Sequence, residues 1–252
     1  MKNFLTTLTC ASLLATAAIA DITRVEMGAG AWMQDVKGSA SYSDAGADGS
    51  YTSSEKDKTQ PYVWALVKHP VPLVPNLRLE YVSLEDSGIA TGEFKDFDVT
   101  GSANMAYDMK QYDIIPYYNI LDNTFWVTLD LGLDIKVIDL SYDVTPIGAA
   151  TIAGDVSGSE TIAIPLLYVR ARTEIPTTNI GLEADIKYVK AGDSTVYDVR
   201  AKLDYTLDFM PVIQPAIELG YRMQKIDIDE SDADATVDLE FSGAYVGLML
   251  RF

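Results

Sequence analysis

An alternation of apolar and polar residues with a period of two constrains this chain more than any other feature of its sequence. It is clearest in residues 125–137, where the apolar set is Val127, Leu129, Leu131, Leu133, Ile135 and Val137. The residues between them are Thr128, Asp130, Gly132, Asp134 and Lys136. A helix would scatter the apolar set around its axis, whereas a strand places all six side chains on one face. The segment is therefore predicted to be a β-strand with one apolar and one polar face.

The same period recurs along almost the whole chain and predicts an all-β protein. It is clear in 180–190 and 197–207 and weaker in the remaining segments. In 105–118 the phase changes near Lys110, which suggests a β-bulge. In 161–173 the phase is ambiguous around Pro165, a residue that a bulge would tolerate. The ten predicted strands are 25–34, 60–69, 77–84, 105–118, 125–137, 161–173, 180–190, 197–207, 213–223 and 242–252.

The links between these segments alternate in length. Short links are expected at 69–76, 119–124, 175–179 and 208–212, and long or polar links at 42–59, 85–104, 139–160, 191–195 and 227–238. An even number of antiparallel strands with short turns at one end and long loops at the other is typical of bacterial outer-membrane barrels. A soluble β-sandwich gives no reason for this asymmetry. The sequence predicts a ten-stranded antiparallel transmembrane β-barrel, with eight strands as the alternative.

Residues 1–20 have the form of a cleaved signal peptide. Lys2 provides a positive start, an uncharged stretch follows, and Ala18-Ile19-Ala20 has the small-x-small form of a signal-peptidase site. The barrel is then expected to comprise residues 21–252. In that part the longest run without Asp, Glu, Lys or Arg is 144–154, which is too short for a membrane-spanning helix.

The charge and the scarce His and Cys residues exclude several functions. With 37 acidic against 19 basic residues and a net charge of −18, the chain is not expected to bind nucleic acid. Its one cysteine lies in the expected signal peptide and its one histidine is His69, so no zinc site and no cofactor are predicted. A membrane-embedded hydrolase or an omptin-type protease needs a histidine near the membrane or the extracellular rim. Because His69 falls in a short link, the prediction is a turn histidine and no enzyme.

Period two does not say which face is outside, since a lipocalin-like soluble barrel keeps its apolar residues inside. Two features favour an apolar outer face. The polar phase carries neighbouring opposite charges, as in the alternate residues from Asp198 to Asp204, which suit a wet or salt-bridged lumen. Tyrosines make up 15 of the 25 aromatic residues and often fall near strand ends, as interfacial girdles require.

A third feature is the C-terminus, where Phe252 follows apolar residues at every second position: Ala244, Val246, Leu248 and Leu250. This ending resembles the C-terminal signal of outer-membrane barrels. Together with the signal peptide it makes the whole mature chain similar to small proteobacterial barrels of the OmpW and OmpA type. The resemblance implies the outer membrane of a Gram-negative bacterium, contact with its lipids and lipopolysaccharide, and Phe252 as the signal read by the outer-membrane assembly machinery. Unlike OmpA, this chain is expected to carry no domain after the barrel.

Ten charged residues on the polar phase are predicted to line the lumen. They would form either a structural lattice of salt bridges that fills a narrow barrel or the wall of a small conduit. Trp32, Arg78 and Glu80 are large enough to help fill the same space. The ten residues are Asp130, Asp134, Glu183, Asp185, Asp198, Arg200, Lys202, Asp204, Glu218 and Arg222.

One link carries a weak calcium-loop pattern. Asp227, Asp229, Ser231 and Asp238 match ligand positions of a calcium loop, but Asp232 stands where the loop needs Gly, and Asp238 replaces its Glu. The residues are weak candidates for a divalent-cation site, and a solvated acidic loop is the alternative.

The function predicted from these observations is a non-enzymatic outer-membrane barrel, either structural or a narrow channel for small solutes. The alternative is a surface protein whose acidic extracellular loops bind divalent cations, lipopolysaccharide or a host partner.

Overall fold

The computed structural model describes residues 23–44, 47–54, 57–71, 73–124, 126–209, 213–229 and 235–252. The predicted signal peptide lies outside them. No helix among the described residues is long and apolar enough to cross a membrane. The strands are β1 (Arg24–Asp44), β2 (Ala47–Ser53), β3 (Lys58–Lys68), β4 (Asn76–Glu93), β5 (Phe97–Thr124), β6 (Val127–Pro146), β7 (Thr151–Gly154), β8 (Ser157–Glu174), β9 (Ile180–Ala191), β10 (Ser194–Thr206), β11 (Gln214–Ile228) and β12 (Ala235–Arg251).

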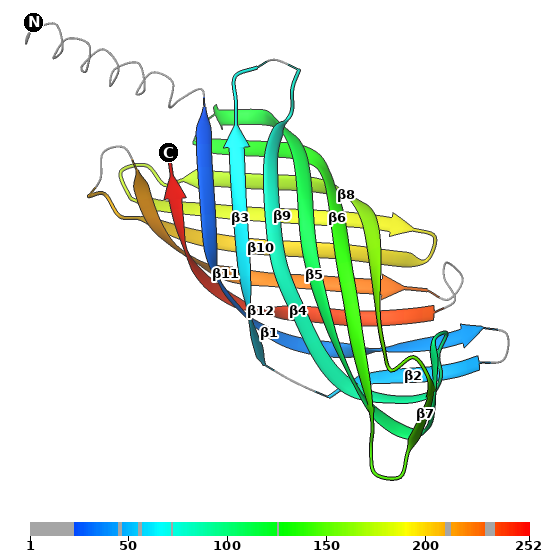
Figure 1. Cartoon of the computed structure of the whole chain (residues 1–252). Helices are drawn as coiled ribbons and strands as arrows, with labels where there is room; N and C mark the ends of the chain where they lie inside the picture. The colour runs from blue at the N-terminus through cyan, green and yellow to red at the C-terminus, as the bar shows by residue number, and fades with distance from the viewer. Residues whose placement is uncertain are drawn as a thin grey trace, which may run out of the picture.

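These strands close into a ten-stranded antiparallel β-barrel (Figure 1). The order around the ring is β1, β3, β4, β5, β6, β8, β9, β10, β11 and β12, and β12 pairs with β1 to close it. β2 continues the position of β3, because both strands pair with β1 and with β4. β7 lies outside the ring, paired with the far end of β5. The prediction of ten strands is confirmed, and the alternative of eight is wrong.

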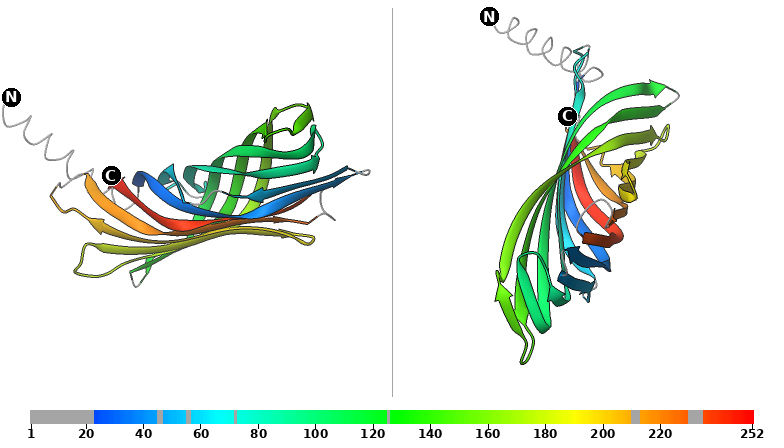
Figure 2. Two further views of the ribbon diagram at one scale, coloured as in Figure 1. Left: turned by 90° about the horizontal axis from the view of Figure 1, so that it is seen from below. Right: turned by 90° about the vertical axis from the view of Figure 1, so that its right-hand side faces the viewer.

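The two ends of the barrel differ. At the short-turn end lie the links after β3, β5, β8 and β10, together with the last residue, where the Phe252 amide donates to the Val25 carbonyl at 2.9 Å. At the opposite, long-strand end the strands project unequally, and β5, β6 and β7 reach furthest (Figure 2).

The strands are much longer than the sequence pattern indicates. β1 has 21 residues and β5 has 28, whereas about 9–11 residues cross a membrane. The predicted long loops at 42–59, 85–104 and 139–160 are therefore wrong, because most of their residues continue the strands. Their Gly and Asp residues have weak strand propensity, so pairing with neighbouring strands makes them extended.

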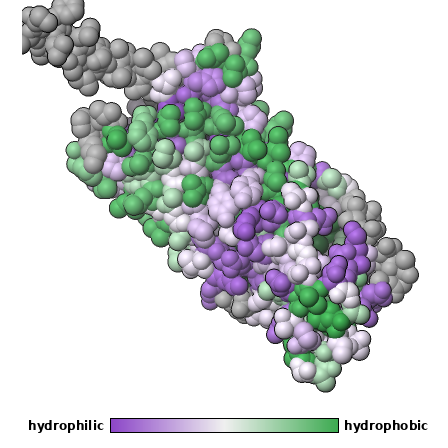
Figure 3. All heavy atoms as spheres, viewed as in Figure 1, coloured by the Kyte–Doolittle hydropathy of each residue, from purple (hydrophilic) through white to green (hydrophobic). Residues whose placement is uncertain are grey.

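Along the strands the apolar and polar faces exchange sides. In the half of β6 near the short-turn end, Asp130 and Lys136 are buried inside, while Leu131 and Leu133 are 44% and 59% exposed on the outer face. Further along, Ile138 is buried inside, and the outward residues are Asp139, Ser141 and Asp143. One half of the barrel therefore has an apolar outer surface, which we call the belt, and the other half has a polar outer surface over an apolar interior. On the face shown in Figure 3 the apolar side chains gather in the upper half, near the short-turn end.

Tyrosines mark the edge of the belt toward the long-strand end. They are the last belt residues on four strands: Tyr81 on β4, Tyr112 on β5, Tyr188 on β9 and Tyr197 on β10. The rings of Tyr81 and Tyr112 contact each other, with centroids 5.2 Å apart. Tyrosine prefers the boundary between hydrocarbon and water, so this row has the position that the predicted girdle requires.

The two predicted bulges, near Lys110 and around Pro165, are wrong, and the exchange of faces explains the sequence patterns that suggested them. Lys110 pairs with Ser83 and with Asp139 in ladders that have no shift at this position. Pro165 lies opposite Ile135 in an unbroken ladder with β6, and the ladder between β8 and β9 ends at Leu167. The apolar residues change faces at Lys110 because the strand leaves the belt, and no extra residue is inserted.

Candidate functional site

All ten charged residues predicted for the lumen are buried inside the barrel. They lie on four strands: Asp130 and Asp134 on β6, Glu183 and Asp185 on β9, Asp198, Arg200, Lys202 and Asp204 on β10, and Glu218 and Arg222 on β11. Two strands with clear alternation, β9 and β10, therefore contribute six of them.

The interior holds further charged residues that the sequence prediction did not include. Lys136 and Lys187 occupy the polar phase of clear strands, so the alternation was a sufficient signal for both. The phase of the alternation is ambiguous around Pro165, so the sequence did not assign Arg170 and Arg172 to the inner face. The additional buried residues are Glu26, Asp113, Lys136, Arg170, Arg172, Lys187 and Arg251, and Arg78 and Glu80 are buried with them as expected.

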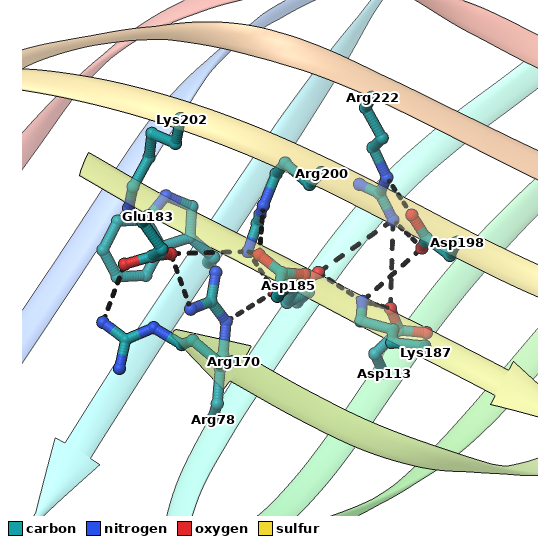
Figure 4. Close-up of polar contacts among 12 residues, drawn as sticks. Arg78, Asp113, Arg170, Glu183, Asp185, Lys187, Asp198, Arg200, Lys202 and Arg222 are labelled. Atoms are coloured by element: carbon teal, nitrogen blue, oxygen red, sulfur yellow. Dashed lines mark hydrogen bonds and ion pairs between the residues drawn. The ribbon is translucent and has the colours of Figure 1, made fainter. Parts of the chain in front are cut away.

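Glu183 on β9 lies at the centre of one cluster of ion pairs (Figure 4). Its Oε2 accepts hydrogen bonds from Arg170 Nη2 at 2.7 Å and from Arg172 Nη1 at 3.3 Å. Its Oε1 accepts a hydrogen bond from Arg78 Nη1 at 3.3 Å and lies 3.1 Å from Lys202 Nζ. One carboxylate thus connects β9 with β4, β8 and β10.

Asp113 and Asp198 form a second cluster. Lys136 Nζ donates to Asp113 Oδ1 at 2.7 Å, and Lys187 Nζ donates to the other oxygen of Asp113. Asp198 accepts two hydrogen bonds from Arg222, at 2.9 and 2.6 Å. Because both carboxylates are buried, this pairing offsets the cost of removing the charges from water.

Arg200 connects the two clusters. It donates to Asp185 Oδ2 at 2.8 and 2.9 Å and to Glu80 Oε1 at 3.1 Å, and Glu80 Oε2 accepts from Lys187 at 2.6 Å. Asp134 is also buried in this region, but neither of its carboxyl oxygens has a hydrogen-bond partner among the described residues. We call the set of buried charged residues in the belt half the charged lattice.

At the short-turn end the lattice reaches the last strand. Arg251 donates to Glu26 Oε1 at 3.0 Å and to Asp204 Oδ2 at 2.8 Å, so the closing pair β1 and β12 is tied to β10. A cavity of about 30 Å³ opens here, lined in part by Arg24 and Lys68. It has room for about one or two water molecules.

Glycines make space for aromatic rings inside the belt half. Tyr62 Oη and Trp64 Nε1 both donate to Glu218 Oε1, at 2.7 and 3.0 Å. A Cβ on Gly28 would lie 2.4 Å from Trp64 Nε1, and a Cβ on Gly247 would lie 2.2 Å from Tyr62 Oη. These two positions on β1 and β12 therefore need glycine for the rings to reach Glu218.

Toward the long-strand end the interior is filled by apolar and aromatic side chains, which we call the apolar plug. Asp86 is buried within it, and its Oδ2 accepts hydrogen bonds from Tyr51 Oη at 2.7 Å and Tyr107 Oη at 3.4 Å. Burial and the neighbouring Asp86 carboxylate raise the pKa of Tyr107 above its ordinary value. The plug residues are Val36, Tyr51, Leu84, Tyr107, Met109, Ile138, Val196, Ile226, Leu239 and Phe241.

Among the residues that the structure describes, the weak calcium-loop candidates do not come together as a metal site. Asp227 and Asp238 lie opposite each other on β11 and β12, and Lys225 Nζ is 3.7 Å from the first and 3.4 Å from the second. The Asp229 amide donates to Ser194 Oγ at 3.0 Å. Ser231 and Asp232 lie outside the described residues, and no cluster of three potential ligands exists within them.

His69 and Phe252, the two other residues that the sequence singles out, both lie at the short-turn end. His69 Nε2 is 3.0 Å from the Pro75 carbonyl oxygen, and its Nδ1 accepts from the Val71 amide at 3.2 Å. Phe252 is 45% exposed, and it shares the outward phase of Leu248 and Leu250 on β12.

No protein-family model and no curated protein sequence matches this chain. Among solved structures, the outer membrane protease OmpT from Escherichia coli has a TM-score of 0.57 at 9% identity, over 91% of this chain and 97% of that chain. The translocator domain of the autotransporter NalP from Neisseria meningitidis has a TM-score of 0.42 at 10% identity, over 98% of both chains. The likeness to OmpT shows that this chain has the fold of an outer-membrane β-barrel.

Proposed function

We propose that the protein is a non-enzymatic barrel of the Gram-negative outer membrane whose role is structural, with at most a narrow conduit for small solutes. The belt and its row of tyrosines support the membrane location, because they match the outer surface of a transmembrane barrel in polarity. The narrower resemblance to OmpW- and OmpA-type barrels stays a prediction.

The filled interior is the observation that carries this proposal. A barrel of about eight strands can be filled by side chains, whereas 16–18 strands leave an aqueous channel. Here the charged lattice occupies one half of the interior and the apolar plug the other. An ion crossing the barrel would have to break buried ion pairs and then pass an apolar layer, and both steps are unfavourable.

The contacts of His69 support a role without catalysis. Both ring nitrogens contact backbone groups of its own turn, at the end of the barrel away from the long strands. A general base for a serine or a water nucleophile needs one ring nitrogen facing the reacting group. We propose that this histidine shapes the turn.

Conductance across planar lipid bilayers tests the proposal. We expect the refolded protein to give either no steps or single-channel steps far below those of a general porin, with cation preference because the rim is acidic. Heat-inactivated protein is the matched control. Porin-sized, anion-selective steps from the folded protein would contradict the filled interior.

A second candidate function is binding at the long-strand end. The strands carry a polar surface well beyond the belt, and its exposed acidic residues include Asp139, Asp143, Glu160 and Asp238. This surface suits divalent cations or the phosphates of lipopolysaccharide bridged by them. Calorimetric titration of the folded protein with Ca²⁺ or Mg²⁺ tests it, with Asp227→Asn/Asp238→Asn as the variant. This candidate would be favoured over the conduit if the protein shows no conductance but binds the cations, and if the variant no longer binds them.

A further inference from the structure

The turn between β3 and β4 presents an apolar surface at the short-turn end, at the top of Figures 1 and 3. Val71, Leu73 and Val74 are 55%, 92% and 51% exposed. The sequence has no Asp, Glu, Lys or Arg from His69 to Leu77. Such exposure at three neighbouring apolar residues marks an interaction surface.

Hydrogen bonds hold this turn in an extended position on the barrel. The His69 amide donates to Asn76 Oδ1 at 3.0 Å, and Asn76 Nδ2 donates to Asn119 Oδ1 at 2.9 Å. Tyr118 Oη donates to the Leu73 carbonyl at 2.9 Å. The turn is therefore attached both to its own strands and to β5, and its apolar side chains remain turned away from the interior.

Leu73 takes a backbone conformation that is costly for a leucine. Its φ is +68°, in the left-handed region that a branched side chain rarely adopts. A strained residue persists where the surrounding contacts impose it. Here the contacts impose a conformation that leaves Leu73 almost fully exposed, so burial inside this chain does not account for its presence.

The belt is too short at this position of the ring. On β5 the belt runs from Tyr112 to Ile120, which is about 26 Å along the strand and about 20 Å along the membrane normal at a tilt of roughly 40°. On β4 the outward apolar residues run only from Leu77 to Tyr81, which is about 13 Å along the strand and about 10 Å along the normal. The hydrocarbon band of an outer-membrane barrel is about 25 Å tall.

The turn occupies the missing part of the belt. It lies beside the end of β5, as the bond between Tyr118 and Leu73 shows, and Tyr118 and Ile120 are exposed apolar neighbours. Exposed apolar residues thus continue from Val67 through the turn to Leu77, and the one charged residue in this stretch, Lys68, forms an ion pair with Asp122 at 2.5 Å. The surface is continuous with the belt and shares its chemistry.

We propose that Val71, Leu73 and Val74 insert into the lipid leaflet at the short-turn end and complete the belt where β4 is too short. The molecules that contact this surface are phospholipids, at the level where their acyl chains meet their headgroups. The inference rests on the proposed membrane location, and it adds a lipid contact that the strands alone do not make.

Depth measurement by tryptophan fluorescence tests this proposal in the full barrel refolded into phosphatidylcholine vesicles. Trp126 is exposed and is replaced first, as Trp126→Phe, while Trp32 and Trp64 are buried and give a constant background. In that background Leu73→Trp is compared with Thr177→Trp and Leu219→Trp. Thr177 is a matched control, because it lies in another short turn, is exposed and has a φ of +64°. Leu219 is exposed on the belt.

We expect brominated phosphatidylcholine to quench Leu73→Trp to at least half the extent seen for Leu219→Trp, and iodide in the buffer to have little effect. Thr177→Trp should show the opposite pattern. If Leu219→Trp is quenched by brominated lipid and Leu73→Trp only by iodide, the turn faces water and the inference is wrong. Protection of Leu73→Trp from both quenchers would indicate a protein contact and would also overturn it. If Leu219→Trp escapes the brominated lipid, the membrane location itself fails. Should Leu73→Trp not fold, as judged by heat-modifiable gel mobility, Val74→Trp replaces it.

Discussion

At the scale of single residues, neighbouring side chains on β6 lie in opposite environments, because one faces outward and the next faces the interior. Leu131 faces out of the belt, whereas Asp130 is buried and accepts hydrogen bonds from Asn119 at 2.5 Å and Arg170 at 2.6 Å. An outward Arg near the middle of the membrane costs about 2–4 kcal/mol, while Asp130→Asn keeps the shape and one charge partner remains for Arg170. Leu131→Arg should therefore impair insertion into vesicles far more than Asp130→Asn, measured as the heat-modifiable fraction. Equal folding of both variants, or the reverse order, would favour a soluble barrel.

The charged lattice predicts a second difference between single residues. Glu183→Gln leaves Arg170, Arg172 and Lys202 buried without their shared carboxylate. Removing one partner of a buried ion pair costs roughly 3–5 kcal/mol. Asp35→Asn is the matched control, because the Asp35 side chain is 39% exposed and pairs with the exposed Lys37 at 2.9 Å, a contact worth at most about 1 kcal/mol. Urea unfolding of the refolded variants should show a large drop for the first and little change for the second. Similar stabilities would mean that water replaces the lost carboxylate.

At the scale of elements, the closing strand β12 decides whether the barrel has an open edge. It pairs with β11 on one side and β1 on the other, and Phe252 extends the second ladder to Val25. Deleting Phe252 removes one ring at the belt edge, worth about 1.5–3 kcal/mol, and leaves the rest of the ladder. If Phe252 is also the assembly signal, its deletion should lower outer-membrane levels in cells more than Leu250→Ala does, while both variants refold in detergent. Wild-type levels of both in cells would refute the signal.

At the scale of the whole molecule, the exchange of faces predicts which end meets the cell exterior. The long-strand end has a polar outer surface and apolar interior, as a water-soluble barrel has, so we expect it to lie in water. Because outer-membrane barrels keep their short turns in the periplasm, we expect the long-strand end outside the cell. Ser41→Cys on β1 and Thr177→Cys in the β8–β9 turn are both exposed positions, and the expected mature chain contains no other cysteine. A large maleimide that cannot cross the outer membrane should label Ser41→Cys on intact cells and Thr177→Cys only after permeabilisation. The opposite pattern would invert the proposed orientation.

The alternation along the sequence was sufficient to predict the strands of the belt half and their number in the ring, and the tyrosines, the neighbouring opposite charges and the C-terminal residues added which face is outside. These are properties that each strand carries by itself, because a period of two assigns every side chain to one face. β9 and β10 show this most directly, since all six of their predicted lumen residues are buried.

Other features depended on strands that are distant in sequence. Arg78 meets Glu183 although they lie 105 positions apart, and Arg200 meets Glu80 across 120 positions. No local pattern encodes which buried charges become partners, because the closure and register of the barrel bring them together. The same holds for the strand extensions beyond the belt, where pairing overrides weak strand propensity, and for the apparent phase change at Lys110. At Lys110 the side chains continue to alternate between the two faces without a bulge. Only the tertiary structure shows that the strand leaves the belt there, so that its inner face becomes apolar and its outer face polar.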